Sequence, residues 1–132
     1  MDVILYLPLE DGRGELIKKL TDIIVHVDRA EVYRTVETFS NRLKQPTEDT
    51  PIALLLAPSK KDLREILSIS DLLSDIRIIL ILPDREDDTI AKGHSLHPRF
   101  LSYLDSDFKE IADVMSKMLV ASGQYPHHRK AE

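Results

Sequence analysis

The chain has 132 residues, a length that suits one domain with a single buried core. Its residues are 42% hydrophobic and 31% charged, which is typical of a globular protein and excludes an intrinsically disordered chain. The formal net charge of −5 argues against nucleic acid as the main partner, because phosphate binding requires a basic surface. Since the chain contains no cysteine, disulfides, thiolate chemistry and zinc–thiolate sites are excluded.

The apolar runs are far shorter than the ~20 residues that a membrane-spanning helix requires. The N-terminal segment contains the acidic residue Asp2 and lacks the basic residues with which a signal peptide begins. We therefore expect a cytoplasmic protein without a membrane partner. We also expect one domain over residues 1–121 and a flexible tail over residues 122–132, because the tail has no periodic pattern.

The first third of the chain predicts two strands and two helices. Val3–Leu7 is an apolar run without helical periodicity, which is typical of a strand covered on both faces. An apolar stripe at helix spacing follows within residues 16–24, and the alternating segment Glu31–Thr35 then fits an edge strand. A shorter stripe over residues 36–43 predicts a helix that is closed by Pro46.

The middle of the chain predicts two further buried strands with a helix between them. Ile52–Leu56 and Arg77–Leu82 are short aliphatic runs without alternation. The apolar positions within residues 63–73 have helix spacing and predict one helix, for which Ser59 is the expected N-cap and Asp62 occupies the capping-box position.

The last third predicts a short helix, an edge strand and a long helix. Residues 87–92 form at most two helical turns, which we expect Gly93 to end. Arg99–Leu104 follows Pro98 and fits a strand at the opposite edge of the sheet. Residues 108–119 carry the clearest apolar stripe, with steps of three and four residues.

Strand and helix thus alternate five times, which predicts right-handed crossovers and a parallel sheet between two helix layers. We therefore expect an α/β fold: a three-layer, doubly wound sheet of five parallel strands in the flavodoxin-like order 2-1-3-4-5.

Two segments make the chain resemble a bacterial response-regulator receiver domain. Ser102–Ile111 (SYLDSDFKEI) is similar to the fifth strand of the receiver and the start of its last helix. Ile79–Asp84 (ILILPD) is similar to its fourth strand and the loop that follows. Nearly all of residues 2–121 can be aligned with this pattern, so the resemblance implies a receiver-like fold and a role in signal transduction.

The positions that carry out phosphotransfer in receivers hold other residues here. The phosphoacceptor position falls on Ala57 or Pro58, and neither side chain has an oxygen atom. The hydroxyl position falls near Leu82 or Pro83, and the lysine position falls on Ser106. The resemblance therefore implies a degenerate pseudo-receiver without a phosphoacceptor aspartate.

Carboxylates follow several predicted strands at the edge where ligands bind in doubly wound folds. They are Glu10 and Asp11, Asp84 and Glu86, and Asp105 and Asp107. One hypothesis is a divalent-cation site that includes Glu10, Asp11 and Asp84, because hard cations prefer carboxylate oxygens. The favoured interpretation is that acids stabilise the helix N-termini that follow each strand. Receivers hold Mg²⁺ with an acidic pair at the end of the first strand, and Glu10 and Asp11 are displaced from that position by about two residues.

No nucleophile–base pattern is present, so we expect neither an enzyme nor a cofactor. In receivers the fourth helix, fifth strand and fifth helix form the usual partner surface. The resemblance therefore suggests an interface that includes Leu101, Tyr103, Val114 and Val120. The predicted function is a non-phosphorylatable regulatory module of bacterial signalling that binds either another signalling protein or a second copy of itself in a homodimer. Two alternatives stay open: a domain that binds a divalent cation or small ligand at the acidic strand ends, and phosphotransfer on a displaced aspartate such as Asp84.

Overall fold

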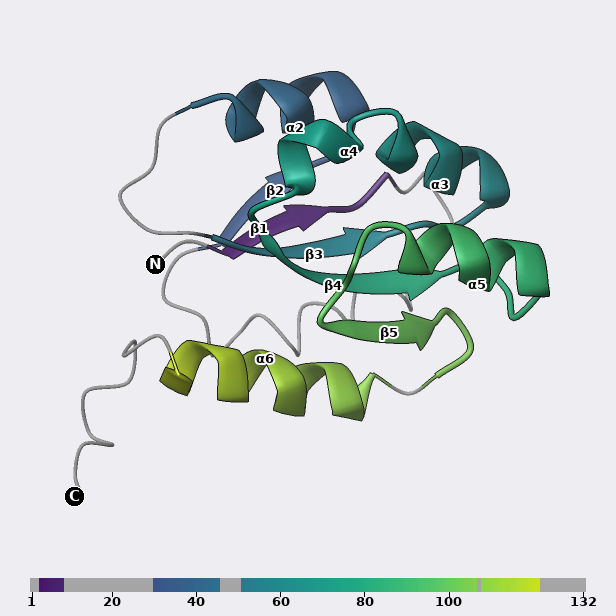
Figure 1. The fold of residues 1–132 in the computed structure, drawn as a ribbon. Helices are drawn as coiled ribbons and strands as arrows, with labels where there is room; N and C mark the ends of the chain where they lie inside the picture. The colour runs from purple at the N-terminus through teal and green to yellow at the C-terminus, as the bar shows by residue number, and fades with distance from the viewer. Residues whose placement is uncertain (1–2, 9–29, 46–50, 107, 122–132) are drawn as a thin grey trace.

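The computed structural model describes residues 3–8, 30–45, 51–106 and 108–121 (Figure 1). Within these residues five strands form one parallel sheet in the order β2-β1-β3-β4-β5. The strands are β1 (Val3–Tyr6), β2 (Ala30–Tyr33), β3 (Ile52–Leu56), β4 (Arg77–Leu82) and β5 (Phe100–Tyr103). The helices are α2 (Val36–Leu43), α3 (Lys60–Leu67), α4 (Ser70–Leu73), α5 (Asp87–His94) and α6 (Lys109–Ala121). The predicted α/β, flavodoxin-like arrangement is confirmed.

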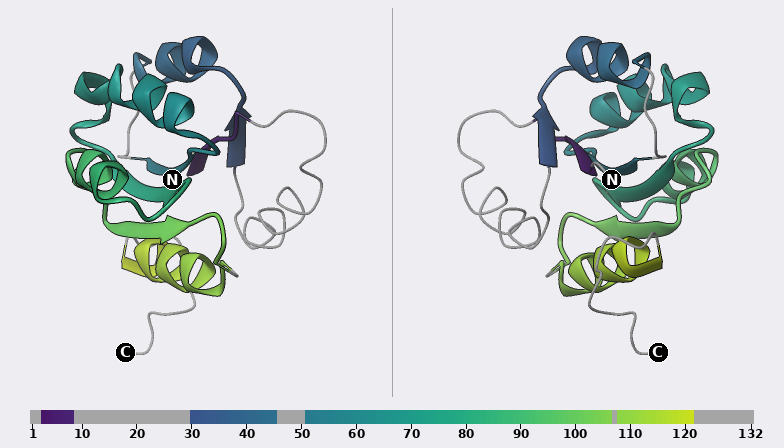
Figure 2. Two further views of the ribbon diagram at one scale, coloured as in Figure 1. Left: turned by 90° about the vertical axis from the view of Figure 1, so that its right-hand side faces the viewer. Right: turned by 90° about the vertical axis from the view of Figure 1, so that its left-hand side faces the viewer.

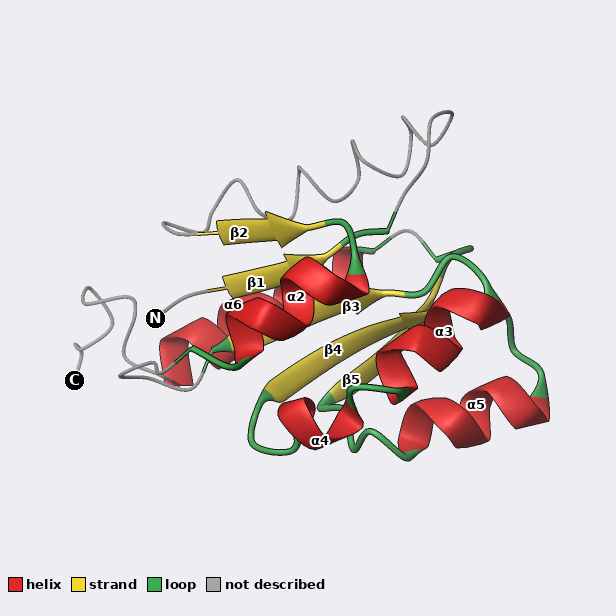
Figure 3. Cartoon of the chain, turned by 90° about the horizontal axis from the view of Figure 1, so that it is seen from above, coloured by secondary structure: helices red, strands yellow, loops and turns green. Residues whose placement is uncertain are grey.

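The helices lie on both sides of the sheet. Figures 1 and 2 show α2, α3, α4 and α5 over one face, here called the α2 face, and α6 over the other, here called the α6 face. Viewed from above, the strands lie side by side with β2 and β5 at the two edges and β3 at the centre (Figure 3). Both edge strands were predicted as such, and the run Ile52–Leu56 is the central strand.

Each central strand divides its side chains between two hydrophobic clusters. In β4, Ile79 and Ile81 belong to the α6-side cluster, whereas Ile78, Leu80 and Leu82 belong to the α2-side cluster. Because helices cover both faces, consecutive residues are buried, and the sequence therefore shows an unbroken apolar run instead of alternation. The strands β1, β3 and β4 are all almost completely buried.

The start of α3 agrees with the prediction, but its end does not. The Ser59 hydroxyl oxygen accepts a hydrogen bond from the backbone N–H of Asp62 at 3.2 Å, which confirms Ser59 as the N-cap. The predicted single helix over residues 63–73 is wrong, because α3 ends at Leu67 and α4 begins at Ser70. The Ser68 hydroxyl donates to the carbonyl of Glu65 at 2.6 Å, and this bond stabilises the break. The apolar stripe crosses the break because α3 and α4 both bury side chains on the α2 face.

The prediction that Gly93 ends α5 is also wrong, since the helix continues to His94. A Cβ atom at Gly93 would lie 3.1 Å from one methyl carbon of Leu82 and 3.3 Å from a methyl carbon of Leu80. Glycine therefore allows α5 to approach β4 closely. The role of Gly93 is therefore helix–sheet packing. In the sequence, a glycine with this role looks the same as a glycine that ends a helix.

The last helix begins one residue after its predicted start. Phe108 has a φ of 65°, in the left-handed region, and precedes α6. Its carbonyl accepts the first helical hydrogen bond from Ala112 at 3.2 Å, and its side chain is buried in the α6-side cluster. The left-handed backbone turns the chain so that the ring enters the core while the helix lies over the sheet.

The predicted helix over residues 16–24 and the tail over residues 122–132 lie outside the described residues. In the part of the chain that the structure covers, no helix has the length and apolar character needed to cross a membrane.

Candidate functional site at the carboxyl edge of the sheet

The central strand ends in a buried apolar position. Ala57 is completely buried in the α2-side cluster, and its backbone N–H donates to the carbonyl of Ile81 at 2.9 Å. Pro58, which follows it, is half-buried. In a doubly wound fold this end of β3 borders the crevice between β1 and β3, where ligands usually bind. Neither side chain offers an oxygen or nitrogen atom to that crevice.

The position expected for the receiver's lysine carries a serine pair. The Ser106 and Ser102 hydroxyl oxygens are 3.0 Å apart, and Ser102 lies buried on the α6 face. A hydroxyl pair of this kind has no charge with which to hold a phosphoryl group. Of the two residues expected near the receiver's hydroxyl position, Leu82 is buried in the core and Pro83 is half-buried.

Asp84 follows β4 and has a defined hydrogen-bond environment. Its Oδ1 accepts from the backbone N–H of Glu86 at 2.9 Å. This bond is the largest cause that lowers the pKa of Asp84, followed by the neighbouring hydroxyl of Thr89 and the charge of Lys60. The Thr89 hydroxyl itself is buried. The carboxylate is therefore held in its charged form.

Two basic side chains, which were not anticipated, neutralise other acids of this edge. The ammonium group of Lys60, from α3, pairs with the Glu86 carboxylate, and this hydrogen bond raises the pKa of Lys60. A guanidinium nitrogen of Arg85 donates to Oδ1 of Asp105 at 2.8 Å. In the sequence, these pairings are indicated only by the neighbours of the two residues. Lys60 follows the N-cap serine, and Arg85 lies between Asp84 and Glu86.

The described residues of this edge do not provide a complete ligand set for the hypothesised cation site. Among the residues that the structure describes, no three His, Cys, Asp or Glu side chains are placed to hold a metal ion. Glu10 and Asp11 lie outside the described residues, as does Asp107. The cation site stays a prediction, for which Asp84 is the described member.

The suggested interface residues lie on both sides of the edge strand β5. Leu101 and Tyr103 are half-buried and pack against the α2-side cluster, whereas Val114 packs against the α6-side cluster. The side chain of Val120 lies outside the described part of α6. Figure 1 shows β5 between α5 and α6, at the edge of the sheet. We call the surface around Leu101, Tyr103 and Val114 the β5 face.

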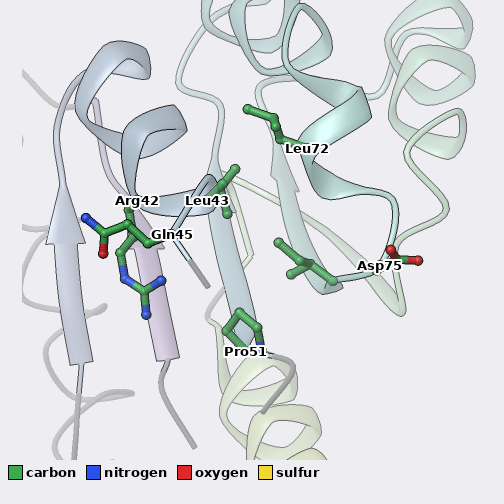
Figure 4. A pocket seen from close by; sticks show the side chains of 7 residues that line it. Arg42, Leu43, Gln45, Pro51, Leu72 and Asp75 are labelled. Carbon is green, nitrogen blue, oxygen red and sulfur yellow. The ribbon is translucent and has the colours of Figure 1, made fainter. Parts of the chain in front are cut away.

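A hollow of about 210 Å³ lies at the opposite, amino edge of the sheet (Figure 4). It is lined by Arg42, Leu43, Gln45, Pro51, Leu72, Asp75 and Ile76. The Nε of Arg42 donates to Oε1 of Glu31 at 2.7 Å, and the Tyr33 hydroxyl donates to the same oxygen at 2.6 Å. In Figure 4 Arg42 lies beside β2 while Asp75 points away on the far side, so the two charges do not converge on a ligand.

Comparison with known proteins assigns no family: the chain matches no protein-family model and no curated protein sequence.

Proposed function

We propose that this chain is a receiver-like interaction module that acts in bacterial signal transduction without being phosphorylated. In this proposal it works in the cytoplasm and docks another signalling protein, or a second copy of itself, through the β5 face. The observation that carries the proposal is the completely buried methyl group of Ala57 at the end of the central strand. A position that holds no oxygen and no solvent access cannot accept a phosphoryl group.

The neighbouring side chains support this proposal. Lys60 and Arg85 are paired with Glu86 and Asp105, so these two cations are already matched by the protein's own acids. The described strand ends offer no phosphoacceptor at the position where receivers have one, which favours a role in surface contact. Leu101 and Tyr103 give the β5 face partly exposed apolar area beside an edge strand, which is suited to a protein interface.

The first test is incubation with acetyl phosphate and Mg²⁺ followed by intact mass measurement. We expect no added phosphoryl mass. A gain of one phosphoryl group that disappears in Asp84→Asn would overturn the proposal and establish phosphotransfer on the displaced aspartate.

The second test is sedimentation velocity over a range of protein concentrations, together with capture of partners from the native lysate. Leu101→Glu and Val114→Glu place a charge on the β5 face, one on each side of the strand. We expect at least a tenfold loss of self-association or partner capture. Gln45→Glu adds the same charge at an exposed position after α2 and serves as the control, and urea unfolding of all three variants separates lost docking from lost folding, because Leu101 and Val114 also pack against the core clusters. Equal behaviour of all three variants would count against docking through this face.

A further inference from the structure

Arg85 contacts both the β5 face and the carboxyl edge of the sheet. The β4–β5 register pairs Leu82 with Tyr103, so the two strands end at the same level. The loop after β4 therefore brings Arg85 next to Tyr103 and to Asp105, two residues further on. The guanidinium carbon lies 4.0 Å from the centroid of the Tyr103 ring, while a nitrogen of the same group bonds Asp105.

We infer that Arg85 is a positioning residue that clamps the ring of Tyr103 and so sets the shape of the β5 face. Its biological consequence rests on the proposed docking function, whereas the clamp itself concerns only the folded chain. A guanidinium is planar and can bind a carboxylate at its edge while its flat face covers an aromatic ring. Asp105 thereby orients the cation that holds the ring.

Arg85 and Asp105 favour one orientation of the Tyr103 ring but do not lock it, because both charged groups are in contact with solvent. The Arg85 and Asp105 side chains are 58% and 71% exposed, and exposed ion pairs are individually weak. Tyr103, however, also packs against the α2-side cluster, so its ring has few alternatives once the cation is in place. A modest interaction is sufficient to choose between side-chain rotamers that differ little in free energy.

The chain offers a matched control for this interaction. Lys92 pairs with Asp88 within α5 at 3.0 Å, and its side chain is 43% exposed. Lys92→Gln removes one exposed cation and one exposed ion pair, as Arg85→Gln does. The two variants therefore have the same net charge and differ in whether the cation that contacts Tyr103 is lost.

The experiment is solution NMR of the full chain with the Tyr103 ring resonances assigned through Tyr103→Phe. In the wild type we expect cross-peaks between the Arg85 side chain and the Tyr103 ring, and one dominant χ1 rotamer. Arg85→Gln should raise the population of minor rotamers about threefold or more, Asp105→Asn should act in the same direction, and Lys92→Gln should leave Tyr103 unchanged. Identical Tyr103 rotamer populations in Arg85→Gln and the wild type would overturn the clamp.

Sedimentation and partner capture with the same variants separate this inference from the docking proposal. If Arg85→Gln frees Tyr103 but association is unchanged, the clamp stands and docking through Tyr103 fails. If Tyr103 is unaffected while Leu101→Glu still abolishes association, docking stands and the clamp fails.

Discussion

Ala57 combines two properties that decide what the end of β3 can do. Its methyl group fills space in the α2-side cluster, and its backbone N–H is already used in a hydrogen bond to β4. An acidic side chain at this position would be transferred from water into the core without a compensating charge. Its burial would destabilise the folded state.

Ala57→Asp should therefore lower the free energy of unfolding by at least about 3 kcal/mol at neutral pH, since a carboxylate is buried without a partner. Pro58→Asp is the matched control. Because Pro58 is half-buried, we expect a loss of about 1 kcal/mol there. Urea unfolding of both variants measures the difference. Equal losses would show that the strand end is open to water.

Tyr6 is the second residue whose environment has a measurable consequence. It is the last residue of β1, it is 1% exposed, and its ring stacks on Phe39 with centroids 5.1 Å apart. Burial is the main cause that raises the pKa of its phenol from 10.0 to about 12, and the charges of Glu65 and Asp62 add to it.

A raised folded-state pKa means that the unfolded chain loses the Tyr6 proton first as the pH rises. The stability linked to this proton is fully present below about pH 10 and is lost as the pH approaches about 12. Tyr6→Phe should therefore show a smaller decline of unfolding free energy over this alkaline range than the wild type. Phe39→Leu removes the stacked ring but keeps the phenol, so its curve should be lower and have the wild-type slope. Parallel curves for Tyr6→Phe and the wild type would contradict the assignment.

At the scale of elements, the helix–sheet contact of α5 shows where local patterns mislead. Glycine is a common helix terminator, so the sequence predicted an end at Gly93. In the structure α5 includes Gly93 and ends one residue later, at His94, and the missing side chain lets the helix lie against Leu80 and Leu82. The two uses of glycine are indistinguishable until the distance between helix and strand is known. The sequence did not reveal the break between α3 and α4 for a related reason. Both helices bury side chains on the α2 face of the sheet, so the apolar stripe continues across the break.

Gly93→Val tests this packing role. A valine side chain would overlap the buried methyl groups of Leu82, and we expect a loss of about 1–3 kcal/mol in unfolding free energy. Ala91→Val introduces the same β-branched residue at an exposed position of the same helix, where the loss should be about 0.5 kcal/mol. Thermal and urea unfolding provide the comparison. If Gly93→Val were as stable as Ala91→Val, the close approach would have no energetic role.

At the scale of the whole molecule, the two hydrophobic clusters share the same strands. Alternate residues of β1, β3 and β4 contribute to the α2-side and the α6-side cluster. Loss of either cluster uncovers one face of the central strands. Because these strands also carry the side chains of the second cluster, that cluster is destabilised as well. The described part of the chain should therefore unfold as one cooperative unit.

Adjacent residues of β4 provide the test. Ile79→Ala opens a cavity in the α6-side cluster and Leu80→Ala opens one in the α2-side cluster, each with an expected loss of about 2–5 kcal/mol. Circular dichroism and tyrosine fluorescence should report a single, coincident transition for both variants. Separate transitions in Ile79→Ala, with the tyrosines of the α2 face still ordered, would show that the clusters are independent.

The sequence by itself determined the strands, the edge and central positions, and the apolar end of β3. These features follow from runs of neighbouring residues, because burial on both faces leaves an unbroken apolar pattern in the chain. The sequence also showed the acids Asp84, Glu86 and Asp105, but not what they contact. Only the tertiary structure decided that Lys60 meets Glu86, 26 residues away, and that Arg85 meets Asp105, 20 residues away. Such pairs depend on the register of parallel strands and the lengths of the loops between them, and no local pattern encodes that geometry.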